Sequence, residues 1–234
     1  MPNKDHIPMV VIACKVFEHL LEMHLPQDDR LESITFLDYG LHQIPKNLKD
    51  KIQETIDEIQ KPSLIVLGYG LCGNGLDGIS AGKHILLVPR TDDCIAILLG
   101  SYQEYQHQFQ SIPATYYLTK GWLENASNPL SQYREYEAKY GAETATYVMD
   151  QQYQHYKRLV FVAHNQEDLD NYRPQVEEIA QYCARWGMRY EEILGSDNYI
   201  RHLVEAALAL GYADDQFIVI PPGGELKQSQ FLHY

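Results

Sequence analysis

Positive charge is scarce in this sequence of 234 residues: 19 Lys and Arg stand against 32 Asp and Glu, and the formal net charge is −13. A surface that binds nucleic acid or an anionic membrane needs clustered cations to follow the phosphates. The sequence therefore excludes general affinity for nucleic acid or for an anionic membrane.

Long hydrophobic runs are also lacking. No segment approaches the roughly 18 uninterrupted apolar residues of a membrane-spanning helix. The first residues, MPNKDHIPMVVIAC, lack the cationic start, apolar run and cleavage site of a signal peptide. We therefore expect a cytoplasmic protein with no membrane partner. Apolar residues at 45% and charged residues at 22% are ordinary for a globular chain with one large core or two modest ones.

Local signatures of metal and nucleotide sites are absent as well. The four cysteines form no CxxC pair, and no GxxxxGK[ST] sequence occurs. Gly68 and Gly70 are followed by Gly73, but no helical periodicity comes after them, so the context of a dinucleotide-binding loop is not met. In an intracellular chain of this length, four cysteines indicate metal binding or catalysis more than disulfides.

Short apolar runs alternate with helical patterns along most of the chain. Runs rich in Val, Ile and Leu predict strands at 9–14, 34–37, 63–67, 84–88, 115–118, 158–163, 189–193 and 217–220. Apolar residues at helical spacing predict helices at 16–23, 48–59, 95–108, 169–186 and 199–210, and long helices within 119–156.

This alternation predicts an α/β fold with mainly parallel sheets and helices on both faces. We expect two Rossmann-like halves with a cleft between them. The N-terminal half would span residues 1–118, a helical crossover 119–156, and the C-terminal half 157–234.

Three cysteines fall at the carboxyl ends of predicted strands: Cys14, Cys72 and Cys94. Ligands of open α/β sheets bind outside these ends, where the loops converge. Three thiolates suit a soft or borderline metal, either zinc with one position open or a four-iron, four-sulfur cluster with one iron open. We favour the cluster, because structural zinc more often uses close CxxC pairs.

Two other interpretations of these cysteines stay open. In the first, the three side chains are small core hydrophobes. In the second, Cys72 is a single nucleophile presented by its glycine-rich turn. Cys183 lies within the predicted helix 169–186, where core packing is the expected role.

The glycine-rich segment 68–78 contains five glycines, more than one tight turn requires. We expect its backbone to approach a bound group closely at Gly70 and Gly73, with Tyr69 and Asn74 facing a substrate. A nucleotide-phosphate loop is the alternative.

The segment 90–94 places a cation, a hydroxyl and two carboxylates before an apolar helix. Thr91 or Asp92 would cap that helix. Arg90 would hold an anionic group of the substrate, and Asp93 would act as general acid or base.

Two further residues are candidates for the same site. His42 follows the second predicted strand and would carry a proton or act as a fourth ligand, although a surface role is the alternative. Lys120 follows the strand at 115–118 and would bind the substrate from the cleft.

A family resemblance lies in these same segments. GYGLCGNGLDGI (68–79), PRTDDCIAILLGS (89–101), TYYLTKGWLE (115–124), YGLHQIP (39–45) and VVIAC (10–14) resemble a domain-of-unknown-function family numbered 1638, which occurs in archaea and anaerobic bacteria. The resemblance implies shared family positions at Cys14, at Cys72 with Asn74, at Asp93 with Cys94, and at His42. The family is found near corrinoid-dependent methyltransferase systems, which implies one-carbon or methylamine metabolism by association.

The resulting functional prediction is a metalloprotein whose three-cysteine centre acts on a small anionic substrate in one-carbon, methylamine or sulfur metabolism. If it is an enzyme, we expect a lyase, a desulfurase or a protein related to methyl transfer. One alternative is a non-catalytic partner that delivers a cofactor or metal to a corrinoid or methyltransferase protein, with 119–156 as the partner surface. The other alternative is a nucleotide-binding α/β protein.

Overall fold

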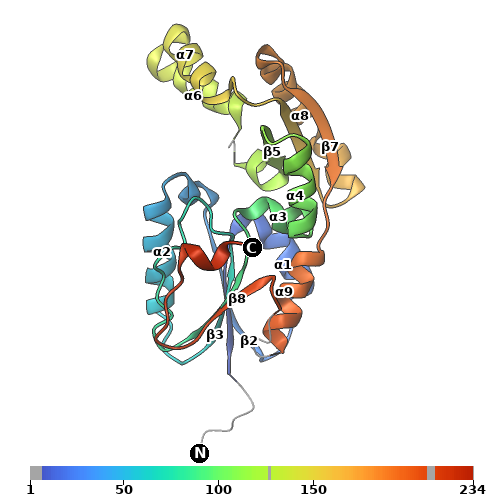
Figure 1. The fold of residues 1–234 in the computed structure, drawn as a ribbon. Helices are drawn as coiled ribbons and strands as arrows, with labels where there is room; N and C mark the ends of the chain where they lie inside the picture. Colours follow the sequence, from blue (N-terminus) through green and yellow to red (C-terminus); the bar gives the residue numbers. More distant parts are fainter. Residues whose placement is uncertain (1–6, 126–127, 210–213, 234) are drawn as a thin grey trace, which may run out of the picture. The chain divides into compact units, whose positions relative to one another are not determined.

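The computed structural model describes residues 7–125, 128–209 and 214–233 (Figure 1). The chain folds into two compact units. Unit 1 comprises the chain up to Tyr102 together with the chain from Asp197 onward, and unit 2 comprises Gln103–Ser196. This division differs from the one expected at residues 118 and 156. The chain returns to its first sheet after residue 196, and the segment expected as a crossover belongs to unit 2.

The described part of unit 1 holds a five-stranded sheet with the order β2-β1-β3-β4-β8. Its strands are β1 (Met9–Cys14), β2 (Leu31–Leu37), β3 (Leu64–Gly68), β4 (Ile85–Pro89) and β8 (Phe217–Ile220). Strands β1 to β4 run parallel, and β8 pairs antiparallel with β4. The chain extends the sheet first to one side of β1 and then to the other, so the topological switch point lies between β1 and β3.

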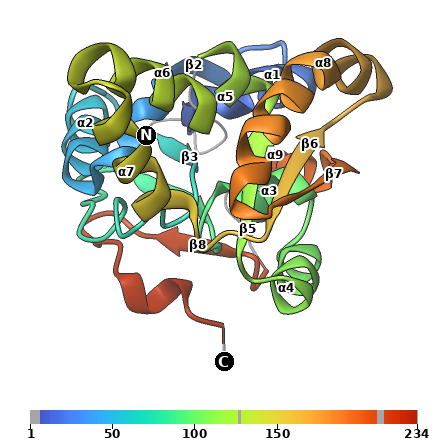
Figure 2. The same cartoon turned by 90° about the horizontal axis from the view of Figure 1, so that it is seen from above.

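Helices cover both faces of this sheet, as predicted. Figures 1 and 2 show α2 (Pro45–Asp57) on one face and α1 (Glu18–His24) with α9 (Asn198–Leu208) on the other. Right-handed crossovers require this arrangement, because the β1-α1-β2 and β2-α2-β3 connections proceed in opposite directions across the sheet. All six residues of β1 and all five of β3 are therefore buried.

The helix expected at 95–108 is two helices, α3 (Cys94–Leu99) and α4 (Tyr102–Ser111). Gly100 ends α3 with a φ of +90° in the left-handed region, which glycine adopts without steric cost. Short 3-10 turns at Lys15–Phe17 (η1) and Tyr39–Gln43 (η2) follow β1 and β2.

Unit 2 contains a parallel sheet with the order β5-β6-β7. Its strands are β5 (Thr115–Thr119), β6 (Arg158–Ala163) and β7 (Arg189–Leu194). The connections contain α5 (Lys120–Glu124), α6 (Pro129–Tyr140), α7 (Ala142–Tyr153) and α8 (Gln166–Cys183). The long helices expected within 119–156 are shorter than predicted: Gly141, with a φ of +81°, separates α6 from α7, and residues 126–127 lie outside the described chain.

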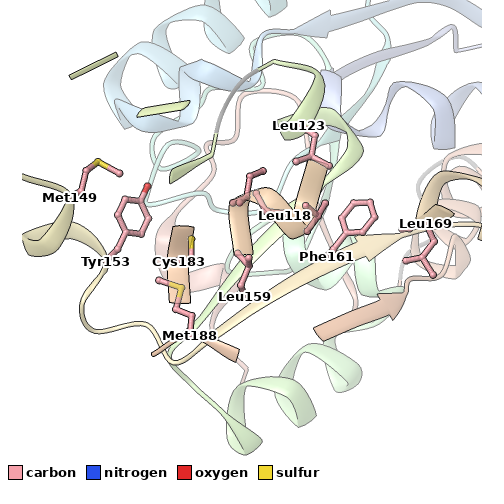
Figure 3. Packing of buried hydrophobic residues seen from close by; sticks show 12 residues of the cluster. Leu118, Leu123, Met149, Tyr153, Leu159, Phe161, Leu169, Cys183 and Met188 are labelled. Atoms are coloured by element: carbon pink, nitrogen blue, oxygen red, sulfur yellow. The ribbon is translucent and has the colours of Figure 1, made fainter. Parts of the chain in front are cut away.

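Cys183 lies in the hydrophobic core of unit 2, as expected. Its side chain is fully buried in the same cluster as Leu159, Phe161 and Met188 (Figure 3). None of the helices in the described ranges is long and apolar enough to span a membrane.

Candidate functional site

The three candidate cysteines all lie in unit 1, at the carboxyl ends of neighbouring parallel strands. Cys14 is the last residue of β1, Cys72 follows β3, and Cys94 begins α3 after β4. Ala13 pairs with Gly68 in the β1–β3 register, so Cys14 and Tyr69 leave the sheet at the same level. The strand order therefore brings these positions together at the switch point, where α/β sheets bind ligands.

Two backbone hydrogen bonds join the glycine-rich loop to the segment after β4. Leu71 N donates to the carbonyl oxygen of Thr91 at 2.8 Å, and Cys72 N donates to that of Asp92 at 2.9 Å. Gly70 makes this approach possible, because a Cβ at this position would lie 2.6 Å from the carbonyl carbon of Asp93. The Sγ atoms of Cys72 and Cys94 lie 3.5 Å apart as a result.

The backbone of Cys72 is in the left-handed region, with a φ of +48°. Gly73 and Asn74 follow at +64° and +71°. A left-handed residue with a Cβ costs roughly 1–2 kcal/mol, so it persists only where surrounding contacts hold it. The hydrogen bonds from Leu71 and Cys72 supply these contacts and turn the thiol of Cys72 toward Cys94.

Asp93 caps α3, which corrects the expectation that Thr91 or Asp92 does so. Its side chain accepts a hydrogen bond from Ile95 N at 2.8 Å, while the Thr91 hydroxyl donates to the Asp93 carbonyl oxygen at 2.9 Å. The cap fixes the first residue of the helix, Cys94, in place.

The surroundings of Cys14 and Cys72 raise the pKa of both thiols. Burial is the main cause that raises the pKa of Cys14, and the charges of Cys94 and Asp38 raise it further. The hydrogen bond with Cys94 is the main cause that raises the pKa of Cys72, followed by burial. A bound metal cation would reverse this shift, because thiols bind metals as thiolates.

Tyr69 is buried beside the cysteines, with 2% of its surface exposed. Burial raises the pKa of its phenol, and the charges of Cys14, Cys94 and Cys72 add to the increase. Its hydroxyl has no hydrogen-bond partner in the part of the chain that the structure describes. An unsatisfied buried hydroxyl costs about 1–3 kcal/mol, so this group needs an explanation.

The spacing of the sulfur atoms bears on the kind of metal. Two thiolates at 2.3 Å from one tetrahedral zinc ion lie roughly 3.8 Å apart. The 3.5 Å between Cys72 and Cys94 is close to this value. Among the described residues, however, no three His, Cys, Asp or Glu side chains converge closely enough to hold one metal ion.

The comparison with known families agrees with the motifs at this site. The model of a family described as "Protein of unknown function (DUF1638)" matches residues 36–204. The chain belongs to the DUF1638 family. The match includes Cys72 and Cys94, whereas Cys14 precedes it. No curated protein and no solved structure matches the chain.

The guanidinium of Arg90 in this DUF1638 protein is bound to the C-terminal segment. Its Nη2 donates to the carbonyl oxygen of Leu232, and its Nη1 lies 3.5 Å from that of Asp215. His233 Nε2 contacts the Arg90 carbonyl oxygen at 2.8 Å, and the His233 ring stacks on Tyr102. Sequence patterns gave no indication of these contacts, which do not favour the predicted role in binding an anion.

The other predicted site residues have less support from the DUF1638 structure. His42 is exposed in η2, and Asn74 is exposed in the glycine-rich loop. No hydrogen bond joins His42 to a cysteine in the described ranges. Gly73 adopts a left-handed φ near α2, where an added Cβ would lie 3.6 Å from Pro45 Cγ. Lys120 belongs to unit 2, and its Nζ binds Asp168 Oδ1 at 3.0 Å.

Proposed function

We propose that unit 1 of this DUF1638 protein binds an iron–sulfur cluster through Cys14, Cys72 and Cys94, with one iron left open to a small molecule. The observation that carries the proposal is that Cys14, Cys72 and Cys94 all lie at the carboxyl ends of neighbouring strands at the switch point of the sheet, with the Sγ atoms of Cys72 and Cys94 3.5 Å apart. The thiols come from three separate chain segments, so the fold brings them to one edge of the sheet.

The origin of the three thiols in separate chain segments favours a cluster over zinc, because structural zinc more often uses close CxxC pairs. The open iron would accept an oxygen or sulfur atom of a substrate, which suits a lyase, a desulfurase or a protein involved in methyl transfer.

Zinc is the second candidate, and one distance supports it. The Cys72–Cys94 separation of 3.5 Å is near that of two thiolates on one zinc ion. Such a site would polarise or activate a bound nucleophile rather than transfer electrons.

Metal analysis of protein purified without oxygen tests the proposal. Iron, acid-labile sulfide and zinc are measured for the parent chain and for Cys14→Ser, Cys72→Ser and Cys94→Ser, together with absorption spectra. We expect iron and sulfide in matched amounts in the parent chain and a loss of most of both in each variant, because each serine removes one thiolate ligand.

Cys183→Ser is the matched control. It removes a buried thiol from the core of unit 2, so it should lower stability without lowering the metal content. Zinc alone, lost in the same three variants, would favour the second candidate. A parent chain with neither metal, after handling that retains both, would contradict the metal site and direct the search to nucleotide binding by the glycine-rich loop.

Turnover of a small molecule distinguishes an enzyme from a protein that only delivers a metal or cofactor. Steady conversion of a small molecule by the isolated metal-loaded chain would support an enzyme. Transfer of the loaded centre to a corrinoid or methyltransferase protein, without turnover, would support a delivery partner.

A further inference from the structure

Tyr69 carries a hydrogen-bond donor that the polypeptide does not use. The side chain follows β3 directly and is 2% exposed, and its hydroxyl has no acceptor among the residues that the structure describes. Tyr199, which is also buried, shows the usual arrangement: its hydroxyl donates to the carbonyl oxygen of Gln216 at 2.7 Å. The unused donor of Tyr69 therefore calls for an acceptor from outside the chain.

The surroundings of Tyr69 indicate where that acceptor lies. Tyr69 leaves the sheet level with Cys14 and three residues before Cys72, whose Sγ lies 3.5 Å from that of Cys94. Sulfur in a thiol is a weak acceptor, and none of the three thiols bonds to the phenol in the described chain. A thiolate-bound metal centre would bring a stronger acceptor into the same space.

We propose that the Tyr69 hydroxyl donates a hydrogen bond to an electron-rich atom of the group held by Cys14, Cys72 and Cys94. That atom would be a sulfide of an iron–sulfur cluster or an oxygen ligand on zinc. The inference rests on the proposed function and deepens it, because it assigns Tyr69 as a positioning residue of the centre. The phenol is a neutral donor, so it suits an acceptor that carries partial negative charge within a site already rich in thiolates.

The test compares Tyr69→Phe with Tyr199→Phe in metal-free and metal-loaded protein. Both substitutions remove one hydroxyl from a buried ring and keep its volume. In metal-free protein, Tyr69→Phe should leave the Tm unchanged or raise it, because no hydrogen bond is lost. Tyr199→Phe should lower the Tm in both forms, because it removes an existing hydrogen bond.

Loading with metal is expected to change the Tm of the two variants by different amounts. The rise in Tm on loading should be smaller in Tyr69→Phe than in the parent, and equal to the parent in Tyr199→Phe. Release of the metal to a chelator should be on the order of tenfold faster in Tyr69→Phe, the effect of losing one hydrogen bond to a charged group.

Two forms of loaded protein distinguish the possible acceptors. With iron and sulfide, Tyr69→Phe should shift the reduction potential of the cluster downward, because hydrogen bonds to cluster sulfurs stabilise the reduced state. With zinc, only the Tm and the release rate should change. If Tyr69→Phe changes the iron-loaded protein, the acceptor is a sulfide of the cluster. If it changes the zinc-loaded protein, the acceptor is an oxygen ligand on zinc.

Equal Tm rises and equal release rates in the parent and Tyr69→Phe would overturn the role of Tyr69, and would indicate that a water molecule satisfies the hydroxyl instead. A parent chain that holds iron, sulfide or zinc in none of these preparations would contradict the proposed function, and with it this inference. The metal content of the parent therefore separates the two failures.

Discussion

Gly70 sets how closely two loops approach at the candidate site. The hydrogen bonds from Leu71 and Cys72 to the segment after β4 require the Gly70 Cα to lie against the backbone of Asp93. An added Cβ would meet the carbonyl carbon and oxygen of Asp93 at 2.6 Å, and backbone atoms cannot rotate away as a side chain does. At the scale of single residues, the pairing of Cys72 with Cys94 therefore depends on the absence of a side chain at residue 70.

We predict that Gly70→Ala separates the glycine-rich loop from residues 91–93 and lowers the occupancy of the metal centre proposed above. The cost in unfolding free energy should be about 1–3 kcal/mol, as for other forced overpacking. Gly82→Ala is the control: an added Cβ meets nothing within 4 Å, and the left-handed φ of +54° costs about 1 kcal/mol. Metal analysis and urea unfolding check both variants. Full metal content in Gly70→Ala would show that the close approach is not needed.

Arg158 joins several elements of unit 2. It is the first residue of β6, is 4% exposed, and donates to Thr115 Oγ1 of β5 at 3.0 Å and to Glu191 Oε2 of β7 at 3.1 Å. Its Nη2 also donates to Gln108 Oε1 of α4 at 2.9 Å. A guanidinium can serve three acceptors in fixed directions, which a lysine ammonium on a flexible stem cannot do in the same plane. At the scale of elements, one buried cation holds the three strands and α4 together.

Arg158→Lys should lower the unfolding free energy of unit 2 by about 2–4 kcal/mol, because the buried cation would lose hydrogen bonds that only the planar guanidinium can make together. Arg134→Lys is the matched control, since its ion pair with Glu178 is exposed and should contribute less than about 1 kcal/mol. Urea unfolding followed by circular dichroism measures the difference. Equal midpoints for the two variants would contradict the structural role of Arg158.

The whole molecule contains two cores, and unit 1 is discontinuous in sequence. The segment that forms α9 and β8 lies after unit 2 in the chain but belongs to unit 1. β8 adds to the sheet beside β4, where Leu86 pairs with Ile220 and Pro89 with Phe217. The local stability of α9 and β8 should therefore follow the core of unit 1 rather than that of unit 2.

Hydrogen exchange measured by mass spectrometry tests this division. Leu159→Ala creates a cavity at a fully buried position of unit 2 and should cost about 2–5 kcal/mol. We expect faster exchange in β5, β6, β7 and α8, and unchanged exchange in β1, β3, α9 and β8. A matching acceleration in α9 and β8 would show that these C-terminal elements belong to the core of unit 2.

Local sequence patterns predicted most strands closely. The strands at 9–14, 158–163 and 217–220 have the observed bounds, because each is a short, buried run of apolar residues. The break at Gly100 was missed, since the apolar pattern continues across it and the left-handed conformation leaves no periodic signal. The antiparallel pairing of β8 with β4 was also missed, because pairing between residues far apart in the chain leaves no local pattern.

The candidate site was predictable only in part. The placement of Cys14, Cys72 and Cys94 at strand ends followed from the rule that parallel strands share a carboxyl edge. The hydrogen bonds from the Arg90 guanidinium to the carbonyl oxygens of Leu232 and Asp215 could not be predicted. They depend on where the C-terminal segment packs in the folded chain. The isolation of the Tyr69 hydroxyl likewise depends on the positions of all its neighbours.

The sequence by itself determined the α/β class, most elements and the candidate cysteines, because hydrophobic periodicity and residue chemistry are local properties. Only the tertiary structure decided the discontinuous course of unit 1, the 3.5 Å approach of Cys72 to Cys94 and the buried, unpaired donor of Tyr69. These features depend on contacts between residues that are distant in the chain. The free energies of such contacts depend on how the whole fold packs.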